Sequence, residues 1–133
     1  MQVYRSKTTK PVTTFVEDLA RMAQTAGFLI HNEDKMAMAH TFGRHGVDVA
    51  AGFDLHMVQI CNPKKAAQSL SKNPERAILI PKFIMVFSQQ GETQIRLLTY
   101  SQETVGQLID DAAFPASLAE SFTQIIDIIE SAR

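Results

Sequence analysis

The stretch AILIPKFIMVFSQQGETQIRLLTY, residues 77–100, holds two apolar runs on either side of a short polar segment. That segment, QQGE, contains the glycine expected in a hairpin turn. The flanking runs, residues 77–88 and 93–100, are rich in the β-branched and aromatic residues that favour strands. The sequence therefore predicts two antiparallel strands joined by a tight turn.

The rest of the chain alternates between strand and helix patterns. Strands are expected at residues 2–9, 28–31 and 54–61, and helices at residues 13–26, 32–43, 63–71, 102–110 and from Pro115 onward. Gly27 suits the C-terminal cap of the first helix, and Asn62-Pro63 suits the start of the third. Helices on one face of a mainly antiparallel or mixed sheet of about five strands satisfy this order. We therefore expect an α+β two-layer sandwich, formed by a single domain over residues 1–133.

Composition excludes several classes of protein. The chain has 133 residues, 45% of them hydrophobic and 20% charged, which is ordinary for a globular domain. A net charge of −1 lacks the basic concentration that nucleic acid requires. The longest apolar stretch, residues 77–87, is broken by Pro81 and Lys82 and is too short for a bilayer, and the N-terminus lacks a signal-peptide pattern. One cysteine agrees with a reducing compartment, so we expect a cytoplasmic protein without nucleic-acid or membrane partners.

Residues 60–87, ICNPKKAAQSLSKNPERAILIPKFIMVF, combine a strand ending in Cys-Asn-Pro, a helix with small residues, and an apolar stretch containing a proline. This pattern resembles the bacterial and archaeal family called domain of unknown function 302 (DUF 302). Residues 15–34 are similar to that family's opening helix, glycine and strand. The resemblance covers about residues 13–100 and leaves residues 102–131 as a C-terminal helical extension. It implies a small α/β protein that forms homodimers and has no assigned activity.

The start of the helix after Asn62 is the leading candidate site. Free backbone N–H groups and the positive end of the helix dipole favour an anion there, and Lys64 and Lys65 add positive charge. We expect a small anionic ligand in a pocket between sheet and helix, bounded by the loop over residues 40–56. Candidate ligand-binding residues are Cys61, Asn62, Lys64, Lys65, His45 and His56. The pattern favours binding over catalysis and identifies no cofactor.

Other titratable residues carry weaker signals. The four histidines have no metal-site spacing, so no metal site is expected. The adjacent carboxylates Asp110 and Asp111 point apart on any regular element, which indicates capping or solvation rather than acid–base chemistry.

Two alternatives to anion binding remain. The first is redox or sulfur-transfer chemistry at Cys61, because a helix N-terminus favours the thiolate, although a free cysteine is more often simply buried. Many members of the resembled family have a second cysteine just after the later proline, where this chain has Lys82. The second is an interaction module that uses the C-terminal helix. Its apolar stripe, which needs a sheet or a second subunit to cover it, consists of Leu118, Phe122, Ile125, Ile126 and Ile129.

Overall fold

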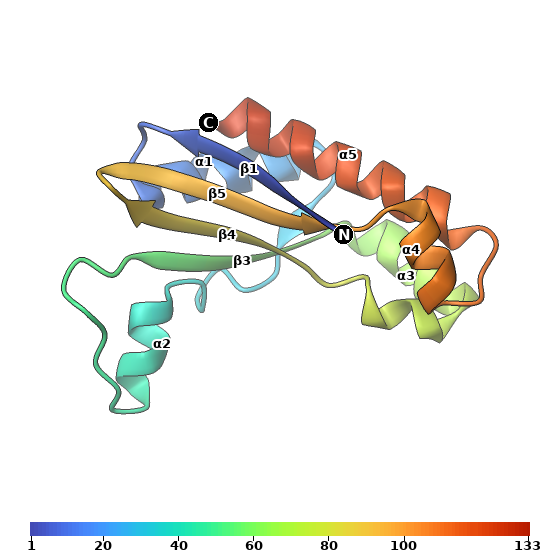
Figure 1. Cartoon of the computed structure of the whole chain (residues 1–133), viewed down its shortest axis with the longest axis horizontal. Coiled ribbons are helices and arrows are strands. Elements are labelled where there is room, and N and C mark those ends of the chain that lie inside the picture. Colours follow the sequence, from blue (N-terminus) through green and yellow to red (C-terminus); the bar gives the residue numbers. More distant parts are fainter.

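Five strands form one antiparallel sheet in the computed structural model, which describes residues 1–133 (Figure 1). The strands are β1 (Gln2–Thr8), β2 (Leu29–Ile30), β3 (Leu55–Cys61), β4 (Lys82–Gln89) and β5 (Glu92–Thr99). Their order across the sheet is β1-β5-β4-β3-β2, and every neighbouring pair is antiparallel. The predicted hairpin is present as β4 and β5. Gln90 and Gly91, both at positive φ, form the two-residue turn that matches the twist of the strands.

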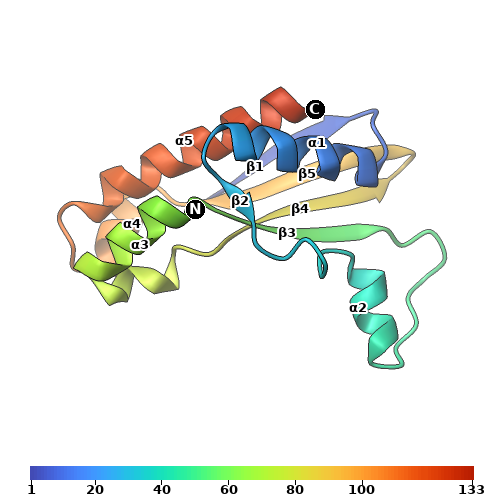
Figure 2. The same ribbon diagram turned by 180° about the vertical axis from the view of Figure 1, so that it is seen from behind.

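Two long helices cover one face of this sheet, as Figure 2 shows from behind. The five helices are α1 (Val12–Thr25), α2 (Met38–Arg44), α3 (Pro63–Lys72), α4 (Gln102–Leu108) and α5 (Phe114–Ala132). α1 and α5 pack side by side over the sheet, while α3 and α4 lie beyond one of its ends. The predicted two-layer α+β sandwich is therefore confirmed. None of the helices has the length and the apolar character needed to cross a membrane.

The hydrophobic core lies between the sheet and the helices α1 and α5. Fully buried side chains come from all of these elements: Phe15 and Leu19 from α1, Val58, Ile84, Ile95 and Leu97 from the strands, and Ile125 and Ile129 from α5. Gly27 ends α1 with a φ of 82°, as predicted, and the chain then enters β2. The apolar stripe of α5 is thus buried inside the monomer except for the partly buried Ile126, and the core, not a second subunit, covers it.

Two predicted elements differ from the structure. Residues 77–81 are not the beginning of a strand, because a short 3-10 helix, η1 (Pro74–Ile78), precedes β4. The Asn73 side chain accepts a hydrogen bond from the backbone N–H of Glu75 and caps this turn. Pro81 has no N–H to contribute to a ladder, so the strand begins after it at Lys82.

The predicted helix over residues 32–43 is also shorter than expected, since only Met38–Arg44 is helical. Asn32 does not cap it. Its Nδ2 donates to the carbonyl of Met57 at 2.8 Å, and its Oδ1 accepts from the backbone N–H of Gln59 at 2.8 Å. Asn32 therefore binds the β3 backbone beyond the end of the short strand β2.

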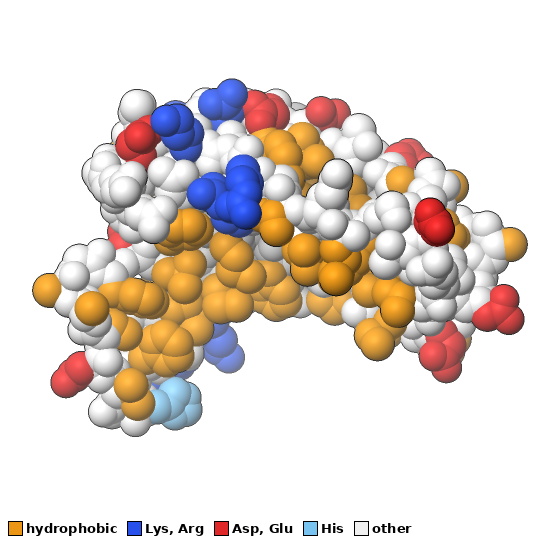
Figure 3. All heavy atoms as spheres, in the orientation of Figure 1, with side chains coloured by type: hydrophobic (Ala, Val, Ile, Leu, Met, Phe, Trp, Pro, Cys, Tyr) orange, Lys and Arg blue, Asp and Glu red, His pale blue; other side chains and the backbone are white.

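The second face of the sheet carries no helical layer and is unusually apolar for a surface. Strand alternation places on it the apolar residues Val3, Leu55, Met57, Phe83, Met85, Phe87 and Leu98, together with the polar residues Arg5, Lys7, Gln59, Gln94 and Arg96. Val3, Phe83 and Leu98 are 45%, 37% and 44% exposed. Figure 3 shows hydrophobic side chains as a continuous band over this face. A half-covered antiparallel sheet normally presents polar residues to water, so this face is suited to contact with another molecule.

Candidate functional site

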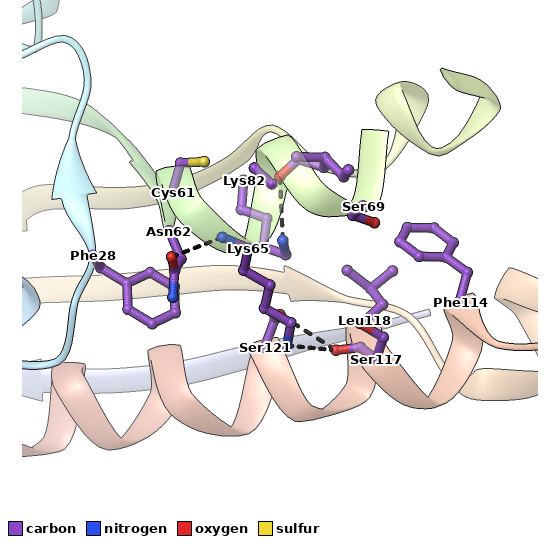
Figure 4. Close-up of a pocket in the computed structure, with 12 residues that line it drawn as sticks. Phe28, Cys61, Asn62, Lys65, Ser69, Lys82, Phe114, Ser117, Leu118 and Ser121 are labelled. Carbon is purple, nitrogen blue, oxygen red and sulfur yellow. Dashed lines mark hydrogen bonds between the residues drawn. The ribbon is translucent and has the colours of Figure 1, made fainter. Parts of the chain in front are cut away.

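A pocket lies at the end of the sheet where β3 ends and β4 begins, between α3 and α5 (Figure 4). Inside it, the centre of a water-sized sphere can occupy a volume of about 30 Å³. One water needs about 10–15 Å³ by the same measure, so the pocket has room for a ligand of a few heavy atoms. Its polar side chains are Cys61, Asn62, Lys65, Ser69, Lys82, Ser117 and Ser121.

Asn62 positions the first turn of α3 at the edge of this pocket. Its Oδ1 accepts a hydrogen bond from the backbone N–H of Lys65 at 3.1 Å, and its backbone is extended, as an N-cap requires. Pro63 occupies the first helical position. The predicted cap is confirmed, with one consequence for the anion site. Because Asn62 already uses the N–H of Lys65 and Pro63 has none, the backbone donors at this helix start are fewer than the sequence suggested.

Two lysine side chains supply the positive charge of the pocket. Lys65 Nζ donates to the carbonyl of Ser117 at 3.2 Å and so joins α3 to α5. Lys82 Nζ donates to the carbonyl of Ile80 at 3.2 Å and lies 5.7 Å from the centre of the Phe122 ring. Neither ammonium group forms an ion pair with a carboxylate.

Burial lowers the pKa of the Lys82 ammonium to about 8. Cys61 opposes this shift, and the positive charge of Lys65 adds to it. An ammonium group loses hydration when it is buried, and here no acidic side chain replaces that hydration. The pocket is therefore cationic and has no negative group of its own except the Cys61 thiol when it ionises.

Cys61 does not have the properties of an activated thiol. Burial raises the pKa of its thiol, and the nearby Lys82 only partly offsets this effect. In Figure 4 the sulfur lies at the edge of the pocket, away from Ser117 and Ser121. Redox and sulfur-transfer chemistry require the thiolate at neutral pH, so nothing in this geometry supports that alternative.

The structure brings together only part of the predicted site. Cys61, Asn62 and Lys65 line the pocket, whereas Lys64 is exposed and points elsewhere. His45, exposed after the end of α2, and His56, near the start of β3, lie outside it. The expectation that the loop over residues 40–56 closes the pocket is therefore corrected.

His56 is a half-buried residue in a separate environment. Strand alternation directs it to the face of β3 opposite to that of Cys61. Its Nε2 lies 3.7 Å from Oδ1 of Asp54, and its Nδ1 is buried without a hydrogen-bond partner. Burial lowers the pKa of His56, and Asp54 partly opposes the shift. His56 cannot serve as a base for Cys61, and no group of three or more metal-ligating side chains is present elsewhere in the chain.

Sequence reasoning missed Lys82 as a pocket residue. The pairing of β3 with β4 sets Lys82 opposite Ile60, which places its side chain beside the end of β3 and the start of α3. One feature of the sequence could have identified it: Lys82 is a single lysine, directly after Pro81, inside an otherwise apolar run. A lysine at such a position must either reach solvent or enter a polar pocket.

A buried ion pair lies next to the pocket and contacts two of its lining residues, Ser69 and Phe114. Arg76 of η1 binds Asp111, which precedes α5, and its Nη1 donates to Ser69 Oγ at 3.0 Å. Asp111 Oδ1 also accepts from the backbone N–H groups of Ala113 and Phe114, at 3.1 and 3.0 Å. The Arg76 guanidinium holds the pKa of the Asp111 carboxyl well below its usual range. Asp111 thus accepts from the first backbone N–H groups of α5, which is one of the two roles, capping or solvation, that the sequence indicated.

These observations define a small α+β protein with a single open antiparallel sheet, two covering helices and a cationic pocket at one end of the sheet. The family model described as "Domain of unknown function DUF302" matches residues 4–132, a range that includes α5, and the chain belongs to this family. The resemblance inferred from the Cys-Asn-Pro segment is thereby confirmed.

A solved structure shares the same architecture. It is described as the "Crystal structure of uncharacterized conserved protein DUF302 from Bacillus stearothermophilus". The likeness covers 100% of this chain and 99% of that chain, with a TM-score of 0.81 and 20% sequence identity. A comparison with curated proteins found no match. At this identity the likeness establishes the fold, and the function must be argued from the site.

Proposed function

We propose that the pocket between α3 and α5 binds a small anion, such as a carboxylate or a phosphate. The observation that carries the proposal is the presence of two lysines, Lys65 and Lys82, in one pocket without a carboxylate partner. An unpaired ammonium loses hydration on burial, and two like charges also repel each other. A bound anion would offset both costs, so the lysine pair favours an occupied pocket.

Three further features support an anion rather than a neutral ligand. The positive end of the helix dipole of α3 is directed at this region, and α3 is long enough, at ten residues, to have a full dipole end. The Ser69 hydroxyl, which accepts a hydrogen bond from Arg76, can donate its own proton to an oxygen atom of a ligand. The small volume limits the ligand to a few heavy atoms.

Calorimetric titration with phosphate, sulfate and acetate tests this proposal. We expect saturable binding of at least one of these anions at low salt, and a loss of about tenfold or more in affinity for Lys82→Met and Lys65→Met, since each removes a charge-assisted contact. Lys64→Met is the matched control, because Lys64 is exposed in the same helical turn and does not line the pocket. Equal losses for Lys64→Met and Lys82→Met, or no binding of any anion, would contradict a specific site.

Proton uptake gives an independent measurement. A bound anion stabilises the charged form of Lys82 and raises its pKa above about 8. Binding near pH 8 should therefore take up protons, and the observed enthalpy should change with the ionisation enthalpy of the buffer. For Lys82→Met this buffer dependence should disappear.

We also propose that a second copy of the chain covers the open face of the sheet. Strand spacing and rise give the four longer strands a flat footprint of about 450–500 Å². The neighbouring α2 region, with the Phe42–Phe53 aromatic pair, extends this area. A stable interface needs about 800 Å² from each partner, so the sheet face and α2 together approach the required size. A homodimer in the cytoplasm, where a single free cysteine stays reduced, agrees with these features.

Sedimentation of variants tests the dimer. Met85→Arg adds a second positive charge directly opposite Arg96 on the open face and should convert a dimer into a monomer without lowering the helical content. Ile78→Arg is the matched control, because Ile78 is 78% exposed on η1, away from the open face. A wild-type monomer at all concentrations, or a dimer that Met85→Arg leaves intact, would exclude this interface.

A further inference from the structure

We infer that Lys82 is a covalent capture site for a small carbonyl compound that carries a carboxylate, such as a 2-oxo acid. This inference rests on the proposed anion binding and names the class of ligand. It follows from the position of Lys82 Nζ inside the pocket, beside a second cationic side chain and with no acid bound to it.

Lys82 differs from the other partly buried lysines of the chain. Lys10 Nζ lies 2.7 Å from the carboxylate of Asp18 and also donates to the carbonyl of Ala132, and Lys65 Nζ bridges to the carbonyl of Ser117 at 3.2 Å. Lys82 Nζ makes only the hydrogen bond to Ile80, within its own segment of chain. Its amine is therefore held in place without being neutralised by an acid, as a nucleophilic lysine requires.

The electrostatics of the pocket agree with this geometry. Burial lowers the pKa of Lys82 to about 8, so about a tenth of the amine is neutral at pH 7, against less than about a thousandth for a lysine with an ordinary pKa. A neutral amine is the form that attacks a carbonyl group. A nearby cation that disfavours the charged form, here Lys65, is one of the known ways to activate a lysine.

Lys65 also explains why the carbonyl compound should be an anion. Its ammonium faces α5 across the pocket from Lys82 and can bind a carboxylate (Figure 4). Bound in this way, a 2-oxo acid has its carbonyl carbon only one bond from the carboxylate, within the span of a pocket of this size. The two lysines then have separate tasks, since Lys65 holds the carboxylate and Lys82 attacks the carbonyl.

The reaction is an imine formation that needs no oxidant or reductant. The Nζ lone pair of neutral Lys82 attacks the carbonyl carbon, the C–N bond forms, and the electron pair of the C=O π bond moves to oxygen. Transfer of a proton from nitrogen to this oxygen gives a carbinolamine. Loss of the hydroxyl group and of the second nitrogen proton releases one water molecule and leaves a C=N bond to Lys82.

Reductive trapping on the full chain tests the inference. The protein is incubated with pyruvate and sodium cyanoborohydride at pH 7.5, and the reduced adduct is located by peptide mass spectrometry. We expect one main adduct, on Lys82, formed at least about tenfold faster than on the exposed Lys64, because more of the Lys82 amine is neutral. Lys82→Arg keeps a positive charge and should abolish this adduct while the slow labelling of Lys64 continues.

Further measurements test whether the carboxylate of the ligand is needed for capture. Lys65→Met should slow trapping of pyruvate about tenfold or more and leave the slower trapping of acetone unchanged, because acetone has no carboxylate to bind. Acetate should compete with pyruvate. Equal labelling of Lys82 and Lys64 by pyruvate overturns the inference, and so does equal trapping of acetone and pyruvate at Lys82.

The calorimetric measurement distinguishes this failure from failure of the proposed function. Saturable binding of pyruvate without an adduct at Lys82 overturns covalent capture and leaves anion binding standing. Absence of both heat and adduct overturns both proposals. Because the wild-type protein supplies these readouts, the test does not depend on whether any variant folds.

Discussion

Arg76 and Asp111 form a two-point ion pair that joins η1 to the start of α5. Arg76 Nε donates to Oδ2 of Asp111 at 2.6 Å and Nη2 donates to Oδ1 at 2.9 Å, and both side chains are only 8% exposed. The guanidinium also lies 5.1 Å from the centre of the Phe114 ring, which lines the pocket. Through Asn73 and Ser69 the pair also connects the end of α3 to the start of α5, the two helices on either side of the pocket.

Removal of Arg76 should destabilise the fold. Arg76→Met leaves the Asp111 carboxylate without its main partner in a place that solvent reaches poorly, and we expect Tm to fall by roughly 10 °C. Arg21→Met is the control, because Arg21 pairs with Asp18 at the surface and such pairs contribute little. Thermal unfolding followed by circular dichroism checks both variants. A fall in Tm no larger than that of Arg21→Met would show that the buried ion pair does not stabilise the fold.

Lys82→Met should stabilise the protein at neutral pH. The folded-state pKa of Lys82, about 8, lies below the ordinary lysine value of 10.5, so between these two values the unfolded chain binds more protons than the folded one. Stability should therefore rise as pH increases from about 8 to 10.5, by at most about 3 kcal/mol. In Lys82→Met this rise should be absent. Urea unfolding of both proteins at pH 7 and pH 10 measures this rise in the free energy of unfolding. An equal rise in the two proteins would refute the prediction.

His56 should make the fold sensitive to mild acid. Its folded-state pKa is lowered from 6.5, so the unfolded chain binds more protons in the interval just below that value. Stability should be complete above pH 6.5 and should decline as pH falls through this interval. His56→Gln should reduce the decline between pH 7 and pH 5, whereas the exposed His45→Gln should not. The measurement is the urea midpoint as a function of pH, and identical profiles for the two variants would argue against His56.

Asn62 allows the cap and the anion site to be tested separately. Asn62→Ala should cost about 1 kcal/mol, because it removes the acceptor for the Lys65 N–H. Asn62→Asp should keep the cap and the stability, since Asp is an equally good N-cap. Its added carboxylate lies in the lysine pocket, however, and should weaken binding of acetate or phosphate. If calorimetry shows that Asn62→Asp binds the anion as tightly as the wild type, the anion does not bind in this pocket.

Local patterns predicted the parts of the fold that depend on neighbours in sequence. The glycine in the QQGE turn, the positive φ of Gly27 and the Asn62-Pro63 cap were all recognised because each acts within a few residues. Residues 77–81 were mistaken for a strand because their apolar character satisfies a strand pattern. Only the capping of η1 by Asn73, whose side chain accepts from the backbone N–H of Glu75, shows that the chain turns there instead.

The pocket depended on contacts that no local pattern carries. Lys82 reaches it because β4 pairs with β3 in the register that sets Lys82 opposite Ile60. Lys65 reaches it because α5 returns across the end of the sheet and presents the carbonyl of Ser117. By contrast, the separation of His56 from Cys61 follows from strand alternation alone, which directs side chains an odd number of residues apart to opposite faces.

The pairing of β1 with β5 also bears on how the chain folds. Gln2 lies opposite Thr99 and Thr8 opposite Thr93, so the first strand of the chain pairs with the last strand of the sheet, far away in sequence. Contacts this distant in sequence slow folding, because the intervening chain must be ordered before they form. The β4–β5 hairpin can form locally, whereas β1 leaves the ribosome long before its partner has been made. We therefore expect docking of the N-terminal strand to be a late event in folding and the point at which newly made chains are most open to mispairing.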